Sequence, residues 1–200
     1  MQILPVGPHA VLVEVANPEE AVSLAAWARA GLPALDVVPG AETVLLDGVA
    51  EPGSLADVLQ GWRPTEPADG RLVEIPVIYD GPDLEDVARR WGCSADEVAR
   101  RHQSVEYVAA FCGFAPGFAY LSGLDVEVPR LDSPRTRVPA GSVALAGRWC
   151  GVYPTESPGG WRLLGRTDVV LWDVLRPQPA LLAPGTRVRF HDATADSAGR

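Results

Sequence analysis

The chain has 200 residues, of which 47% are apolar, and a formal net charge of −9 at pH 7. This length accommodates one large domain or two small ones with real hydrophobic cores, and the acidic balance argues against nucleic acid or an anionic membrane surface as a partner. Because the chain contains no lysine, it has no phosphate-loop lysine, no Schiff-base lysine and no lysine that could carry biotin.

The first half of the predicted N-terminal domain combines a strand with a well-marked helix. Asn17 is suited to cap a helix, with Pro18 at its first position and Glu20 at the capping-box position, and Gly31 ends it. We predict elements, in chain order, at residues 10–15, 18–31, 34–38, 43–46 and 55–59. Together they form a small α/β domain over residues 1–66, and the polar, proline-rich residues 63–70 are the predicted linker.

The second predicted domain, residues 67–192, starts with a strand at 72–79, which Pro76 restricts to a sheet edge or a bulge. Apolar residues at helical spacing then predict a helix from Leu84 to Trp91 that ends at Gly92, and Ser94 with Glu97 forms the capping box of a second helix. Further on, short apolar runs between Gly and Pro turns are typical of an all-β sandwich or barrel. The runs are 105–112, 126–128, 143–147, 150–153, 161–164, 168–173 and 186–191. Residues 193–200 are a predicted flexible tail.

Cysteine usage and the N-terminus indicate a cytoplasmic protein. Cys93, Cys112 and Cys150 are far apart and form no CxxC pair, which favours a reducing compartment and supports neither a disulfide framework nor a zinc site. The first basic residue is Arg29, and no apolar run approaches the length of a membrane span. We therefore expect no bound metal and no membrane association.

A local excess of arginine interrupts this acidic chain. Between residues 130 and 166 six arginines stand against two acids, Asp132 and Glu156. The six are Arg130, Arg135, Arg137, Arg148, Arg162 and Arg166. Guanidinium groups among turns fixed by Gly and Pro are suited to hold a carboxylate or a phosphate with defined geometry. Residues 111–167 are therefore where we expect a functional site.

Three glycine- and proline-rich runs in this segment each have a structural and a functional interpretation, and the sequence leaves both open. Gly113–Leu121 (GFAPGFAYL) predicts either a barrel corner filled by aromatic side chains or a rigid loop that faces a ligand. Pro129–Ser142 predicts either solvated arginines or an anion site beside the Gly-Ser turn that ends it. Ser157–Trp161 (SPGGW) predicts either a hairpin or a mobile lid. His102, on the apolar face of its predicted helix, is more typical of a packed core residue than of a catalyst.

These runs resemble a known family. The patterns are YVxxFxGFxPGFxYL at Tyr107–Leu121, PRxxVPAGSVxxAG at Pro134–Gly147 and GVYPxxSPGGWxLxGRT at Gly151–Thr167. They are similar to those of the B subunit of the bacterial ATP-dependent 5-oxoprolinase, a family also called KipI-like or allophanate hydrolase subunit 1. The resemblance covers essentially the whole chain, and motifs of this length are more specific for the family than for the reaction.

The resemblance implies an α+β fold: a small N-terminal α/β domain followed by a C-terminal cyclophilin-like β-barrel. It implies a non-autonomous component that acts with a KipA-like C subunit and a LamB/YcsF-type A subunit. The implied reaction converts 5-oxo-L-proline, ATP and water to L-glutamate, ADP and phosphate. ATP is then a co-substrate of the complex, together with Mg, and we expect no metal or prosthetic group on this chain alone.

Under this hypothesis arginines bind the anionic groups of substrate or nucleotide, and hydroxyl and backbone donors stabilise a developing oxyanion. The predicted catalytic residues are His102, Ser142 and Arg166. The predicted substrate- or anion-binding residues are Arg130, Arg135, Gly141, Ser157, Gly159, Gly160 and Thr167. The chain departs from the family at Trp149 and Cys150, where many members carry Gln and Thr, so no hydrogen-bonding role is transferred to these two positions.

Two alternatives remain open at this point. One is a KipI-like binding protein that inhibits a sensor histidine kinase, with the arginines playing no catalytic part. The other is a carboxyltransferase component for urea or a related amide, which would need a separate biotin carrier because this chain has no lysine. A prolyl isomerase, suggested by the implied barrel alone, is disfavoured because a fold does not carry a function.

Overall fold

The computed structural model describes residues 1–65 and 70–194. The chain forms two compact units, Met1–Gly70 and Arg71–Arg200. The predicted domain boundary after residue 66 lies outside the described residues, and so do all but the first two residues of the predicted tail, 193–200. No helix in the described part of the chain is both long enough and apolar enough to cross a lipid bilayer.

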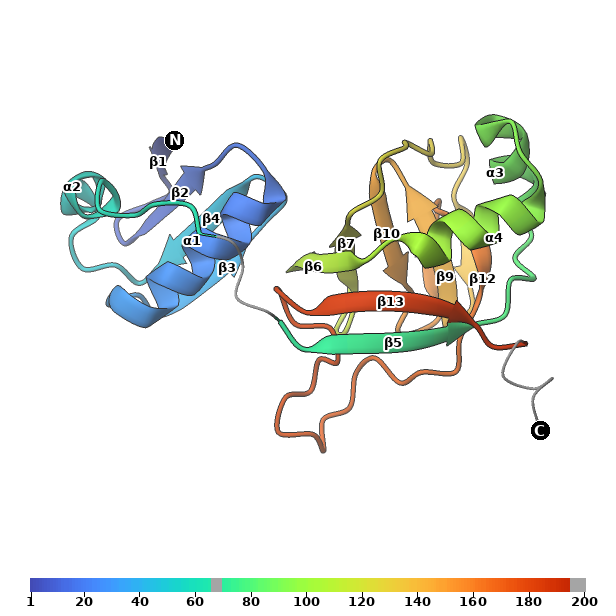
Figure 1. Ribbon diagram of the computed structural model, residues 1–200. Coiled ribbons are helices and arrows are strands. Elements are labelled where there is room, and N and C mark those ends of the chain that lie inside the picture. Colours follow the sequence, from blue (N-terminus) through green and yellow to red (C-terminus); the bar gives the residue numbers. More distant parts are fainter. Residues whose placement is uncertain (66–69, 195–200) are drawn as a thin grey trace. The chain divides into compact units, whose positions relative to one another are not determined.

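The N-terminal unit is a four-stranded antiparallel sheet with one long helix packed against it (Figure 1). The strand order is β1 (Gln2–Pro5), β2 (Ala10–Glu14), β4 (Thr43–Asp47) and β3 (Asp36–Pro39). Helix α1 (Pro18–Gly31) is capped as predicted, because the Asn17 side chain accepts a hydrogen bond from the Glu20 N–H at 2.8 Å. Helix α2 (Leu55–Leu59) follows a 3-10 turn at Pro52–Ser54. Strand β1, which is exposed at both ends and half-buried in the middle, was not predicted.

The C-terminal unit is a sheet of seven strands that curls into a nearly closed barrel (Figure 1). The strand order is β12 (Arg162–Arg166), β9 (Ser142–Ala146), β10 (Trp149–Val152), β7 (Ala119–Ser122), β6 (Tyr107–Cys112), β13 (Arg187–Asp192) and β5 (Leu72–Val77). All neighbours are antiparallel except β13 and β5. The two ends of the sheet meet where Ile78 and Arg166 each donate a backbone N–H to the other's carbonyl at 2.9 Å.

Two helices and a small second sheet complete this unit. Helix α3 (Leu84–Trp91) contacts β12, and helix α4 (Ala95–Ser104) contacts β13. Their predicted ends are confirmed: Gly92 has φ 63° at the end of α3, and the Ser94 side chain accepts from the Glu97 N–H at the start of α4. Strands β8 (Arg135–Val138) and β11 (Ser157–Gly159) pair apart from the main sheet.

The predicted fold class, a small α/β domain followed by a β-barrel, is confirmed. Differences lie in the glycine- and proline-rich runs. Strands β7, β8 and β11 were not predicted because they are short, three or four residues each, and lie within runs rich in turn-forming residues. Conversely, residues 126–128 and 168–173 form no strand and contribute only the single bridges Val128–Gly147 and Trp172–Ala180.

Candidate functional site

The arginine-rich runs meet in a pocket of about 400 Å³ on the barrel, which we call the arginine pocket. It is lined by Asp80, Gly81, Pro82, Arg135, Arg137, Pro139, Ala140, Ser142, Leu163, Gly165 and Arg166. Barrel closure builds it, since the bridge from Ile78 to Arg166 brings the segment after β5 beside the end of β12. Three of the predicted site residues therefore converge here: Arg135, Ser142 and Arg166.

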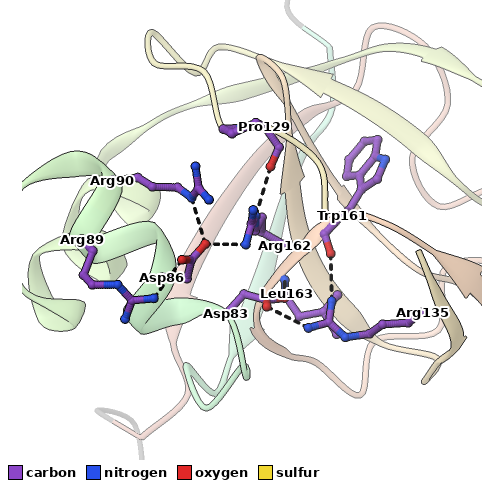
Figure 2. Close-up of polar contacts among 9 residues, drawn as sticks. All are labelled: Asp83, Asp86, Arg89, Arg90, Pro129, Arg135, Trp161, Arg162 and Leu163. Carbon is purple, nitrogen blue, oxygen red and sulfur yellow. Dashed lines mark hydrogen bonds and ion pairs between the residues drawn. The ribbon is translucent and has the colours of Figure 1, made fainter. Parts of the chain in front are cut away.

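A network of aspartates and arginines fixes α3 to the strands beside this pocket (Figure 2). Asp83, which is buried, accepts from Arg135 Nη2 and from the Leu163 N–H, both at 2.7 Å. Asp86 accepts from the almost buried Arg162, and Arg162 also donates to the Pro129 carbonyl. Hydrogen bonding from Arg90, together with the charge of Arg162, lowers the pKa of the Asp86 carboxyl. Arg135 thus serves to hold the barrel to α3, and its charge is compensated.

The other two arginines of the pocket are also ion-paired, but in a more exposed setting. Arg137 lies 2.6 Å from Glu156, and Arg166 lies 2.9 Å from Asp80. The side chains of Arg166 and Asp80 are 56% and 47% exposed. Exposed pairs of this kind contribute only about 0–1 kcal/mol, so a bound anion can replace the carboxylate at little cost. Arg137 was not among the predicted binding residues, but its guanidinium is as available to a bound anion as that of Arg166.

The N–H and hydroxyl groups of Gly141 and Ser142, which were predicted to stabilise an oxyanion, already donate hydrogen bonds within the chain. The Gly141 N–H donates to the Tyr153 carbonyl at 2.7 Å, and the Ser142 hydroxyl donates to the Pro139 carbonyl at 2.8 Å. Gly141 has φ 78°, and a Cβ there would lie 2.1 Å from the Thr167 carbonyl oxygen. These contacts shape the turn between β8 and β9 and leave no N–H or hydroxyl at Gly141 or Ser142 free for a ligand. The predicted oxyanion role does not fit either residue.

The remaining predicted residues lie elsewhere. Ser157 has a buried hydroxyl with no hydrogen-bond partner within the described chain, and Gly159 is packed against the Tyr153 hydroxyl. The Gly160 carbonyl accepts from the Leu131 N–H. Thr167 is buried and lines a separate hollow of about 280 Å³ with Arg166. None of these four residues lines the arginine pocket.

Arg130 lines a different pocket, of about 430 Å³, which we call the aromatic pocket. Its other lining residues are Tyr120, Pro129, Ala146, Gly147, Trp149 and Trp161. The two pockets share a boundary, because Arg135 of the arginine pocket donates to the Trp161 carbonyl at 3.4 Å. The predicted convergence of Arg130, Arg135 and Arg166 on one pocket is therefore wrong: Arg130 is separated from the other two.

His102 lies inside the barrel and reaches none of these pockets. Its side chain is fully buried, with Nδ1 2.8 Å from the Tyr79 hydroxyl and Nε2 3.3 Å from Cys150 Sγ. Burial lowers the pKa of His102 to about 3, so the ring is neutral at physiological pH. An acid–base role on a bound substrate does not fit this position, and the interpretation as a core residue does.

The aspartates of the site were missed by sequence reasoning. Asp80, Asp83 and Asp86 come from the segment between β5 and the first turns of α3, and they precede their arginine partners on the strands by 86, 52 and 76 positions. Their only local signal was acidity near a helix start, which predicts a favourable helix dipole interaction and nothing more. Within the described ranges no cluster of three or more His, Cys, Asp or Glu side chains is arranged to hold a metal ion.

Comparison with known proteins assigns the chain to a family. The family model of the carboxyltransferase domain, subdomain C and D, matches residues 1–182. The chain belongs to this family. It is 44% identical over 168 residues to the 5-oxoprolinase B subunit of Escherichia coli O157:H7, which covers 78% of this chain and 77% of that protein. It is 37% identical over 206 aligned residues to the 5-oxoprolinase B subunit of Haemophilus influenzae, with 95% and 97% covered.

A solved structure has a similar fold. The crystal structure of TTHA0988 matches with a TM-score of 0.78 and 40% sequence identity over 92% of this chain. The chain spans only 40% of the length of TTHA0988. More than half of the TTHA0988 polypeptide is therefore additional to the part that matches this chain.

Proposed function

We propose that this chain is the B subunit of an ATP-dependent 5-oxoprolinase, which converts 5-oxo-L-proline, ATP and water to L-glutamate, ADP and phosphate. The observation that carries the proposal is the 37–44% identity, over most of both chains, to two proteins named as the B subunit of 5-oxoprolinase. The proposed partners are a KipA-like C subunit and a LamB/YcsF-type A subunit.

The chemistry of the reaction explains why one polypeptide is not enough. A lactam is a resonance-stabilised amide, so attack by water needs prior activation, and phosphoryl transfer from ATP to the lactam carbonyl oxygen, with release of ADP, supplies it. A triphosphate carries several negative charges. In the arginine pocket Arg135, Arg137 and Arg166 all have carboxylate partners, and the chain has no lysine. Because only Arg137 and Arg166 are in exposed pairs that an anion can displace, this pocket alone does not fit a triphosphate, and Mg and further cations would come from a partner.

Within this proposal the exposed arginines of the arginine pocket contribute to phosphate binding in the complex. Arg137 and Arg166 are held in weak, exposed pairs that a phosphate can replace. Arg135 keeps its structural bond to Asp83. Ser142 and Gly141 shape the wall of the pocket instead of donating to the substrate.

Exposed apolar side chains on the barrel unit support the proposal that this unit binds a partner protein. Phe114, Trp172 and Leu175 are 60%, 40% and 89% exposed. The loop that carries Phe114 packs against the segment that carries Trp172, because a Cβ on Gly117 would lie 2.8 Å from Trp172 Cβ. Phe114 also has a positive φ of 68°, a conformation costly for a non-glycine residue. Large apolar groups held in water in this way are typical of interfaces between subunits.

The test is reconstitution. The chain is purified alone and together with its two proposed partners, and ADP release is measured with and without 5-oxo-L-proline. We expect ADP release that depends on 5-oxo-L-proline from the three-component mixture and no ATPase activity from this chain alone. ATPase activity of the single chain, or a complete mixture that ignores 5-oxo-L-proline, contradicts the proposal.

The family description favours a second candidate, a carboxyltransferase component for urea or a related amide. It requires a biotin carrier on another polypeptide, because no residue of this chain can be biotinylated. The same preparations, assayed with carboxylated biotin and urea, distinguish it. Inhibition of a sensor histidine kinase stays a prediction of the sequence alone.

A further inference from the structure

The aromatic pocket is a second concave site on the barrel, next to the arginine pocket. Its walls are the rings of Tyr120, Trp149 and Trp161, and Arg130 lies at its edge. A pocket of about 430 Å³ with aromatic walls and few polar groups is the usual form of a small-molecule site. Neither the proposed phosphate contacts nor the exposed apolar side chains of the barrel include this pocket.

The walls of this pocket are rigid. Phe111 stacks on Tyr120 with ring centres 4.3 Å apart and planes at 12°, and it meets Trp149 edge-on at 5.2 Å. Phe118 meets Trp161 edge-on at 5.4 Å. Each wall residue is thus held by another aromatic side chain that does not line the pocket. Flat surfaces fixed in this way are suited to contact a flat ligand ring.

The loop that carries Arg130 is held on both sides. Before it, Val128 and Gly147 exchange two backbone hydrogen bonds at 2.8 and 2.6 Å, and the Pro129 carbonyl accepts from Arg162 at 3.1 Å. After it, the Leu131 N–H donates to the Gly160 carbonyl at 2.8 Å. The backbone at Arg130 is therefore ordered before any ligand binds, which reduces the entropy lost on binding.

Arg130 itself has no compensating acid. Every arginine of the arginine pocket is ion-paired, whereas Arg130 is exposed and makes no ion pair or hydrogen bond with any described residue. The Tyr120 hydroxyl likewise makes no hydrogen bond within the described chain, although its ring is packed. An unpaired guanidinium on an ordered backbone, beside packed aromatic walls, is suited to recognise a single planar anionic group.

We propose that the aromatic pocket binds a flat ring that carries one carboxylate, with the carboxylate on Arg130 and the ring against Trp149, Tyr120 and Trp161. Under the proposed function, on which this identification of the ligand rests, the ligand is 5-oxo-L-proline. One guanidinium matches one carboxylate through two parallel hydrogen bonds. Trp149 then contributes a wall of the substrate pocket.

Binding to the full-length chain tests this assignment by isothermal titration calorimetry with 5-oxo-L-proline, 2-pyrrolidinone and ATP. The ring of 2-pyrrolidinone lacks the carboxylate. Loss of a charge-assisted bond weakens binding about tenfold or more, so we expect this loss for 2-pyrrolidinone and for Arg130→Gln with 5-oxo-L-proline. The matched control is Arg148→Gln, because Arg148 is also exposed and unpaired among the described residues but does not line the pocket. It should change affinity less than about twofold.

The outcomes separate this inference from the proposed function. Absence of saturable binding of 5-oxo-L-proline, unchanged affinity in Arg130→Gln, or displacement of 5-oxo-L-proline by ATP overturns the inference even if the three-component mixture turns over. Arg130-dependent binding without any turnover by the mixture leaves the inference intact and overturns the proposed function. Thermal unfolding of both variants shows that the fold is retained, which the exposure of the two side chains leads us to expect.

Discussion

The Nε2 atom of His102 lies 3.3 Å from the Sγ atom of Cys150 in the interior of the barrel. Forty-eight positions separate the two residues in the chain, and both are fully buried. The thiol stays protonated, since burial raises the pKa of Cys150. The pair therefore joins α4 to β10 through neutral groups, and a charge on either of them disturbs the core.

Protonation of His102 should destabilise the barrel at low pH. The pKa of the histidine is about 3 in the folded chain and about 6.5 when unfolded. The folded pKa is the lower one, so the stabilisation is fully present above pH 6.5 and is lost as the pH falls towards 3. We expect the free energy of unfolding to drop by on the order of a few kcal/mol across this range. Urea denaturation of the wild type and His102→Gln at pH 7 and pH 4 measures it, and an equal drop in both proteins contradicts the assignment.

Removal of the charge at Asp83 should weaken the attachment of α3 to the barrel. Asp83→Asn loses the ion pair with Arg135, and a buried carboxylate that accepts two hydrogen bonds is costly to replace. We expect a loss of about 1–3 kcal/mol in the free energy of unfolding. Asp80→Asn is the matched control because its pair with Arg166 is exposed, and it should cost less than about 1 kcal/mol. Equal losses in the two variants would show that burial does not distinguish these pairs.

Gly141 should tolerate no side chain. It has φ 78°, and a Cβ would lie 2.1 Å from the Thr167 carbonyl oxygen, a backbone atom that cannot move aside. Gly141→Ala should therefore lower the free energy of unfolding by at least about 2 kcal/mol. Gly147 also has a positive φ, 57°, but a Cβ there meets no other atom within 4 Å. Gly147→Ala should cost only about 1 kcal/mol, and thermal melts of the two variants give the comparison.

Arg166 should matter for turnover in the reconstituted complex. If its guanidinium exchanges Asp80 for a phosphate, Arg166→Gln removes a charge-assisted hydrogen bond and lowers kcat/KM by about tenfold to a hundredfold. Stability should change little, because the pair is exposed. Arg148→Gln, outside both pockets, provides the control. Wild-type kinetics in Arg166→Gln would remove the arginine pocket from the reaction.

Short-range signals in the sequence were sufficient for the helices, whereas the fold class followed from the resemblance to a family. The cap at Asn17, the left-handed Gly92 and the cap at Ser94 lie where their residue types predicted them. Each depends on groups within a few positions of one another, so the local sequence contains the whole interaction. The long motifs from Tyr107 to Thr167 likewise indicated the family that the comparison showed.

Only the tertiary structure decided which arginine is available to a ligand. Arg130, Arg135 and Arg166 look equivalent in the sequence. Closure of the barrel, however, pairs Arg135 and Arg166 with aspartates 52 and 86 positions earlier and leaves Arg130 unpaired beside aromatic rings. The availability of a charge depends on the nearest opposite charge in space and on burial. Both are set by pairing between distant strands, which no local pattern in the chain specifies.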